Sequence, residues 1–90
     1  MDILGYITPL SKSDSQTEYD KGRVYAYKSM ISIYELFARY FKDHTRRSIY
    51  FFIYITKMNT VVKKEEGEFP RGKADAFEDV FQHFRPRRSK

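Results

Sequence analysis

The residues best suited to chemistry lie in mid-chain, where two arginines precede a run of aromatic and β-branched side chains. Arg46 and Arg47 stand just before the stretch Ile49–Ile55. Exposed Tyr or Phe side chains can stack on nucleic-acid bases, and neighbouring arginines can hold the phosphates. Because alternate residues of a β-strand face the same side of a sheet, Tyr50 and Tyr54 would share one face. The segment therefore predicts a surface that binds nucleic acid.

The same aromatic face also has a structural explanation. The side chains of Tyr50, Phe52 and Tyr54 are suited to burial under a C-terminal helix or against a second copy of the chain. A homodimer that buries part of this face is therefore an alternative to a monomer. RNA-recognition motifs use a comparable strand, but the stretch 47–54 lacks their consensus glycines, so we assign the chain to no family.

The positive charge is unevenly distributed along the chain. The formal net charge is +5; residues 1–45 hold six bases and six acids, whereas residues 46–90 hold eleven bases and six acids. A basic half is typical of polyanion-binding proteins, because each neutralised phosphate releases a counterion. A charge of this size also serves solubility alone. The predicted nucleic-acid-binding residues are Arg46, Arg47, Tyr50, Tyr54, Lys63, Lys64, Arg85, Arg87 and Arg88.

Domain organisation follows from length and from the composition of the C-terminal end. Ninety residues suffice for one domain, which we place at residues 1–84. Residues 85–90, RPRRSK, carry four positive charges and no acid, so we predict a basic, mobile tail that can contact phosphates.

Catalytic and metal-binding motifs are missing from the sequence. There is no cysteine, no Gly-rich phosphate loop and no G-x-S-x-G motif, and the two histidines lack metal-ligand spacing. We therefore predict a protein that is not an enzyme and that has no cofactor and no metal site. A metal-independent ribonuclease is a minor alternative, for which His44, Arg46, Arg47, Tyr54 and His83 would supply acid, base and charge clamp.

Two elements are predicted for the N-terminal half. Residues 3–10 suit a short edge strand, which Gly5 and Pro9 limit. From about residue 18 to residue 43, apolar side chains recur at three- and four-residue steps, which predicts a long helix. Either Ser15 or Thr17 can cap this helix. Gly22 predicts a weak first turn, because glycine costs about 1 kcal/mol relative to alanine within a helix.

The middle of the chain favours a β-hairpin. Residues 49–56 are β-branched or aromatic, which is typical of a strand, and residues 60–64 can return after a turn at 57–59. Strand alternation would place Ile49, Phe51, Ile53 and Ile55 on an aliphatic face that packs on the long helix. A competing interpretation is a helix over residues 45–66 with Thr45 as its cap.

The predicted fold class is α+β. It consists of a small antiparallel sheet of about three strands, a long N-terminal-half helix packed on that sheet, and a short C-terminal helix over residues 73–84. The N-terminus does not resemble a signal peptide, and the longest apolar run, residues 49–55, is far too short to span a membrane. We therefore expect a cytoplasmic location and no membrane partner.

The sequence thus predicts a non-enzymatic nucleic-acid-binding module that contacts phosphates through its basic C-terminal half. The alternative is a small adaptor or inhibitor that docks on a larger protein through an aromatic patch. Compact aromatic-rich proteins of this length are common among viral and mobile-element products. The sequence does not distinguish DNA from RNA, or a single strand from a duplex.

Overall fold

The computed structural model describes residues 3–84, and they form four α-helices. The helices are α1 (Ile3–Leu10), α2 (Glu18–Tyr40), α3 (His44–Val62) and α4 (Glu68–Phe84). Within residues 3–84 there is no β-strand, so the predicted α+β fold and its sheet are wrong.

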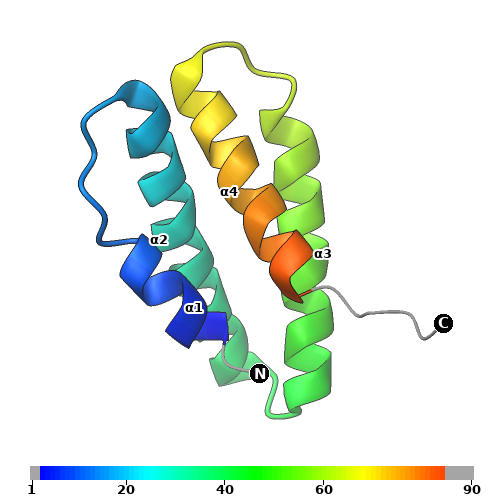
Figure 1. The fold of residues 1–90 in the computed structure, drawn as a ribbon. Helices are drawn as coiled ribbons and strands as arrows, with labels where there is room; N and C mark the ends of the chain where they lie inside the picture. Colours follow the sequence, from blue (N-terminus) through cyan, green and yellow to red (C-terminus); the bar gives the residue numbers. More distant parts are fainter. Residues whose placement is uncertain (1–2, 85–90) are drawn as a thin grey trace, which may run out of the picture.

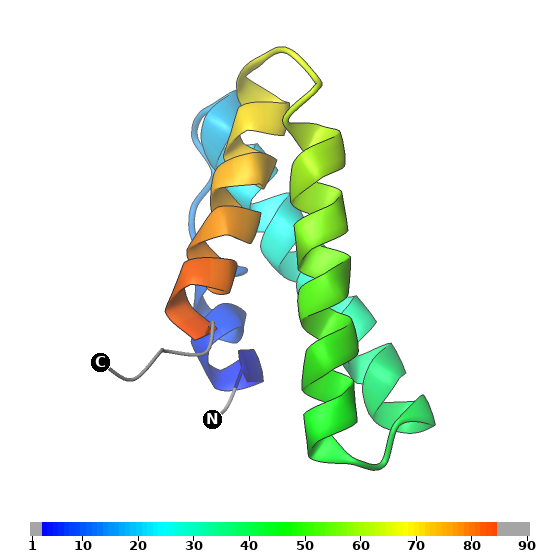
Figure 2. The same ribbon diagram turned by 90° about the vertical axis from the view of Figure 1, so that its right-hand side faces the viewer.

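Helices α2, α3 and α4 form the body of the molecule, and α1 lies against α2 near the end of α4 (Figure 1). Helices α2 and α4 begin at the same end and run in the same direction, whereas α3 runs the opposite way. Seen from the side, α3 stands in front of α2 and beside α4 (Figure 2). Among residues 3–84, no other helix crosses the outer side of α3.

The long helix is confirmed, with its boundaries set by polar caps. The hydroxyl of Thr17 accepts a hydrogen bond from the backbone N–H of Asp20 at 3.1 Å, so Thr17 rather than Ser15 is the cap. Such a cap stabilises a helix by about 1 kcal/mol. The helix ends at Tyr40, three residues earlier than predicted, because Phe41 adopts an extended conformation and Asp43 caps the next helix.

The predicted N-terminal strand is wrong, since residues 3–10 form α1. Ile3 and Ile7 lie one helical turn apart and are both buried. The spacing of these two residues, with Leu10 three positions later, suits the apolar stripe of a helix. Pro9 lies in the last turn of α1, so the helical hydrogen bond that it cannot donate is lost only at the end of the helix.

The predicted hairpin is also wrong: the segment is helical, as in the competing interpretation, but the helix spans residues 44–62 instead of 45–66 and its cap is Asp43 instead of Thr45. The helix α3 is capped by Asp43, whose side chain accepts a hydrogen bond from the N–H of Thr45 at 3.1 Å. Phe51, Ile55 and Val62 recur at helical spacing and are buried. Packing of this stripe outweighs the β-propensity of the individual residues, which is the weaker effect.

The C-terminal helix is confirmed, but it starts five residues before the predicted position. Gly67 has a φ of +118°, a conformation that other residues rarely adopt, and it ends the turn between α3 and α4. Pro70 lies in the first turn of α4, where its missing N–H costs no helical hydrogen bond. The predicted tail, residues 85–90, lies outside the described residues.

Gly22 is not a weak point of α2 but the place where α2 and α4 meet. A Cβ atom added to Gly22 would lie 2.0 Å from the carbonyl oxygen of Phe69, and one added to Gly72 would lie 2.0 Å from that of Tyr19. Two non-bonded atoms cannot approach so closely. The two glycines therefore let the backbones of two parallel helices touch near their starting ends.

The core lies between α2, α3 and α4, with α1 closing one side. Tyr34 of α2 meets Phe51 of α3 edge to face at 5.2 Å between ring centroids. Tyr54 of α3 meets Phe77 of α4 in the same manner at 6.3 Å. The largest fully buried side chains are Ile7, Tyr27, Met30, Phe51, Ile55, Val62, Phe77 and Val80.

Candidate binding surface on α3

One line of exposed side chains follows the open side of α3. Its members are three or four residues apart, so they lie on one face of the helix. They are Arg46, Tyr50, Ile53, Lys57, Thr60 and Lys64, and all six are exposed. We call this set the outer row; Lys64 lies just past the last residue of α3.

Apolar side chains are exposed in and beside the outer row. Ile53 within the row is 45% exposed and Ile49 beside it is 53% exposed, whereas Phe51 between them is fully buried. Val61, at the other end of α3, is also more than half exposed. Contiguous exposed apolar side chains are uncommon on monomers and mark interaction sites.

The remaining exposed large apolar side chains lie on the neighbouring helix. Within the described part of the chain, every such side chain belongs to α2 or α3, and none to α1 or α4. On α2 they are Tyr25, Leu36 and Tyr40. Phe41, at the end of α2, stacks on Tyr50 of the outer row with the ring centroids 4.7 Å apart and the planes 9° apart. This stack fixes the orientation of Tyr50.

The charge asymmetry of the sequence is concentrated on α3. Residues 44–64 hold five Lys or Arg and no Asp or Glu, whereas α4 holds four acids and two bases. In the part of the chain that the structure describes, Arg46, Lys57 and Lys64 take part in no ion pair. The outer row therefore presents three uncompensated cations over about 27 Å, the length of 18 residues at about 1.5 Å each.

Three of the predicted site residues make contacts within the fold. The guanidinium of Arg47 donates to the carbonyl oxygens of Phe41 and Lys42, so it closes the end of α2. Tyr54 is half-buried, and loss of solvent raises the pKa of its hydroxyl. Lys63 pairs with Glu78 of α4 at 3.8 Å, across the outside of the α3–α4 contact.

The other predicted residues divide into two groups. Arg46, Tyr50 and Lys64 lie exposed along the outer row, which brings them onto one surface. Arg85, Arg87 and Arg88 lie outside the described residues. The histidines are placed apart from the row's centre: His44 is the first residue of α3, and His83 of α4 stacks on Tyr6 of α1 at 3.9 Å.

The predicted aliphatic face is wrong, and this error hid part of the surface. Strand alternation grouped Ile49 and Ile53 with Phe51 and Ile55, but the first two are exposed and the last two are buried. Lys57 was assigned to a turn, although it lies in the middle of the outer row. The repeat of three and four residues from 46 to 64 was the signal that could have identified the surface.

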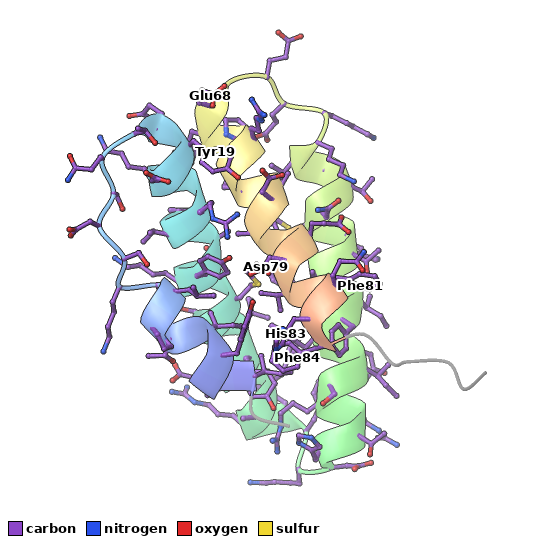
Figure 3. All side chains as sticks on the ribbon, viewed as in Figure 1. Tyr19, Glu68, Asp79, Phe81, His83 and Phe84 are labelled. Atoms are coloured by element: carbon purple, nitrogen blue, oxygen red, sulfur yellow. The ribbon has the colours of Figure 1, made fainter. Side chains whose placement is uncertain are left out.

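A second polar cluster joins α1, α2 and α4. The carboxylate of Asp79 accepts hydrogen bonds from the hydroxyls of Tyr6 at 3.1 Å and Tyr27 at 2.8 Å, and Arg23 donates to Tyr27 at 2.7 Å. Figure 3 shows Tyr19, Asp79 and His83 along the seam between α4 and the other two helices. Burial, together with Asp79, raises the pKa of Tyr27 far above its ordinary value.

This cluster is a structural unit, because its members satisfy one another. Tyr19 donates to Asp75 and accepts from Arg23, so Arg23 links two tyrosine–aspartate pairs. In residues 3–84, no buried side-chain nitrogen or oxygen lacks a hydrogen-bond partner. A part-buried network whose members pair with one another adds stability and specificity to the contact between helices.

The described ranges hold no metal site, and the pockets on their surface do not resemble ligand sites. No three His, Asp or Glu side chains of residues 3–84 gather as a metal ion would require. The groove between α3 and α4 contains a pocket of about 120 Å³ beside Ile55, Asn59 and Phe81. A wider one, of about 440 Å³, lies at the turn between α3 and α4, but most of its lining residues are charged, whereas sites for drug-sized ligands are mostly apolar clefts of about 300–1,000 Å³. The extended surface of α3 is therefore the stronger candidate.

Comparisons with known protein families, curated proteins and solved structures found no match. The function is therefore inferred from the surface itself. Among residues 3–84, no helix combines the length and the apolar character needed to cross a membrane.

Proposed function

We propose that the protein is a non-enzymatic adaptor that docks on another protein through the outer row of α3 and the apolar side chains beside it. The observation that carries the proposal is the exposure of Ile49 and Ile53 on a helix that buries Phe51, Ile55 and Val62 on its other side. Covering these side chains with a partner's apolar surface is favourable by about 25 cal/mol for each Å² removed from water.

The chemistry of the row favours a protein over a phosphate backbone. Phosphates would be attracted to Arg46, Lys57 and Lys64, but they gain nothing from isoleucine or valine. A protein partner can cover apolar and cationic side chains together, and aromatic residues and arginine are frequent anchors at such interfaces. Tyr50, which is held in place by Phe41, supplies a rigid aromatic contact.

A pull-down tests this proposal. The full chain is immobilised and exposed to a nuclease-treated lysate of its source at moderate salt, and bound proteins are identified by mass spectrometry. We expect a partner that is retained by the wild type and lost with Ile53→Asp. The matched control is Ser13→Asp, which adds the same charge in the loop between α1 and α2. Equal retention by Ile53→Asp and the wild type, or no retained partner, would contradict the proposal.

Nucleic acid is the second candidate, and the acid-free composition of residues 44–64 favours it. Arg46, Lys57 and Lys64 would then hold phosphates, together with the C-terminal arginines. Binding should weaken steeply as salt rises, and removal of residues 85–90 should weaken it further. Filter binding at low and at physiological salt measures both effects. Binding that is unchanged in Ile53→Ala would favour nucleic acid over the adaptor function.

A further inference from the structure

We propose that the partner presents an acidic amphipathic α-helix that lies lengthwise along the outer row of α3. The inference rests on the proposed function and specifies its partner. Apolar side chains of the partner helix would pack on Tyr50 and Ile53. Its carboxylates would lie beside Arg46, Lys57 and Lys64.

The row is long and straight enough for another helix to lie along it. The steps from 46 through 50, 53, 57 and 60 to 64 alternate between four and three residues, as they do along one face of any α-helix. Tyr50 and Ile53 are the members of the row that can pack on apolar side chains, and the three cations lie on both sides of them. Since the row extends for about 27 Å, a partner helix of about five turns would match its length.

The composition of the row decides the charge of the partner. Residues 44–64 contain no acid, and the three cations of the row have no ion-pair partner within the described chain. A basic partner helix would face like charges along the whole row, whereas an acidic one would neutralise them. The partner must also carry apolar residues, because Ile49, Ile53 and Val61 would otherwise stay exposed.

Charge also argues against a second copy of this chain on the same surface. Two α3 helices packed face to face would bring Arg46, Lys57 and Lys64 of one copy against the same cations of the other. No carboxylate of residues 44–64 is present to compensate them. Self-association on this surface would therefore be opposed by like-charge repulsion.

The arrangement of the cations argues against an anionic membrane. Amphipathic helices that lie on membranes keep their cations on the polar face and their apolar residues on the other. Lys57 of the outer row lies between Ile53 of the row and the neighbouring Val61, on the same side of α3. A partner helix can alternate carboxylates and apolar side chains to match this order.

A synthetic peptide tests the inference directly. The probe is a fluorescein-labelled peptide of about three heptads, with leucines at a and d and glutamates at the flanking positions. One control peptide has the same composition in an order that destroys the heptad pattern, and another replaces every glutamate by lysine. Anisotropy titrations with the full chain should give saturable binding of the probe, at least about tenfold tighter than binding of either control.

Variants of the protein assign the binding to the outer row. Ile53→Ala removes apolar surface at an exposed position and should weaken binding of the probe several-fold. Lys57→Glu should weaken it by about tenfold and should improve binding of the lysine peptide. Lys12→Glu, which makes the same charge change in the loop between α1 and α2, should leave both affinities unchanged.

Several outcomes would overturn the inference. Equal binding of the shuffled acidic peptide would show attraction by charge alone. Self-association in sedimentation experiments that Ile53→Asp abolishes would assign the surface to a second copy. Binding of vesicles containing phosphatidylserine, or of a DNA duplex, in preference to the probe would assign it to those polyanions. If the peptide fails while the pull-down partner still depends on Ile53, the adaptor function stands and only the acidic helix is wrong.

Discussion

The helices α3 and α4 have similar lengths but opposite surroundings. Helix α4 exposes no large apolar side chain, contacts both α2 and α3, and places Asp79 in a network with two tyrosines. Helix α3 buries one stripe but leaves four large apolar or aromatic side chains exposed, namely Ile49, Tyr50, Ile53 and Val61. Folding thus covers the large apolar side chains of α4, whereas it leaves those of the outer side of α3 exposed. That difference is the basis of the proposal that α3 binds a partner.

The largest expected contrast lies within α3 itself. Phe51→Ala should lower the free energy of unfolding by about 3–5 kcal/mol, because it removes a fully buried ring that packs on Tyr34. Ile53→Ala, two residues away, should change it by less than about 0.5 kcal/mol because that side chain is exposed. Urea unfolding followed by circular dichroism measures both. Similar losses in the two variants would mean that the outer row contributes to the core.

The contact between α2 and α4 should be the next most sensitive place. Gly22→Ala should destabilise the protein by about 2–3 kcal/mol, since the new methyl group would meet the backbone oxygen of Phe69 and a helix must shift. Ser32→Ala, at an exposed position of the same helix, is the control and should be neutral or slightly stabilising. Thermal unfolding compares the two variants. A stabilising Gly22→Ala would disprove the close backbone contact.

The polar network that joins α4 to α1 and α2 should show an intermediate effect. Asp79→Ala should cost about 1–3 kcal/mol, because the hydroxyls of Tyr6 and Tyr27 lose their acceptor. The neighbouring Glu78→Ala removes a surface ion pair with Lys63 and an exposed hydrogen bond from Gln82, which together should be worth about 1 kcal/mol or less. If both substitutions lowered the free energy of unfolding equally, the hydrogen-bonded side of α4 would contribute no more to stability than its solvent-facing side.

The sequence predicted some helices correctly and others not. The spacing of Tyr27, Met30 and Tyr34 in α2 and of Phe77 and Val80 in α4 has a helical period with a polar opposite face, and both helices were predicted. In α3 apolar residues occupy every side, so the segment fits a period of two as well as one of 3.6. Local propensity then favoured strands, and only packing against two other helices decides for a helix.

The candidate site was predicted in part for the same reason. Arg46, Tyr50 and Lys64 were identified by residue type alone, which does not depend on secondary structure. The exposure of Ile53 follows only from a helical period, so it was missed. The role of Arg47 depends on where the carbonyl oxygens at the end of α2 point, and no local pattern in the sequence contains that information.

The smallest expected effect is a change in how stability depends on pH, caused by the hydrogen bond between Tyr27 and Asp79. Burial and Asp79 raise the pKa of Tyr27, despite the opposing effect of Arg23, so the folded state holds this proton more tightly than the unfolded state. The resulting stability is complete below the unfolded pKa of about 10 and is lost as pH rises from there toward the higher folded pKa. Tyr27→Phe should therefore be less stable at neutral pH but lose less stability between about pH 9 and 11. The control is Tyr40→Phe, at an exposed position of α2, whose free energy of unfolding should change with pH as that of the wild type does. Urea unfolding at several pH values measures this dependence. If the free energy of unfolding of Tyr27→Phe changed with pH as the wild type does, the hydroxyl of Tyr27 would not be held by Asp79. Helix α4 would then lack part of the hydrogen-bond network that distinguishes it from α3.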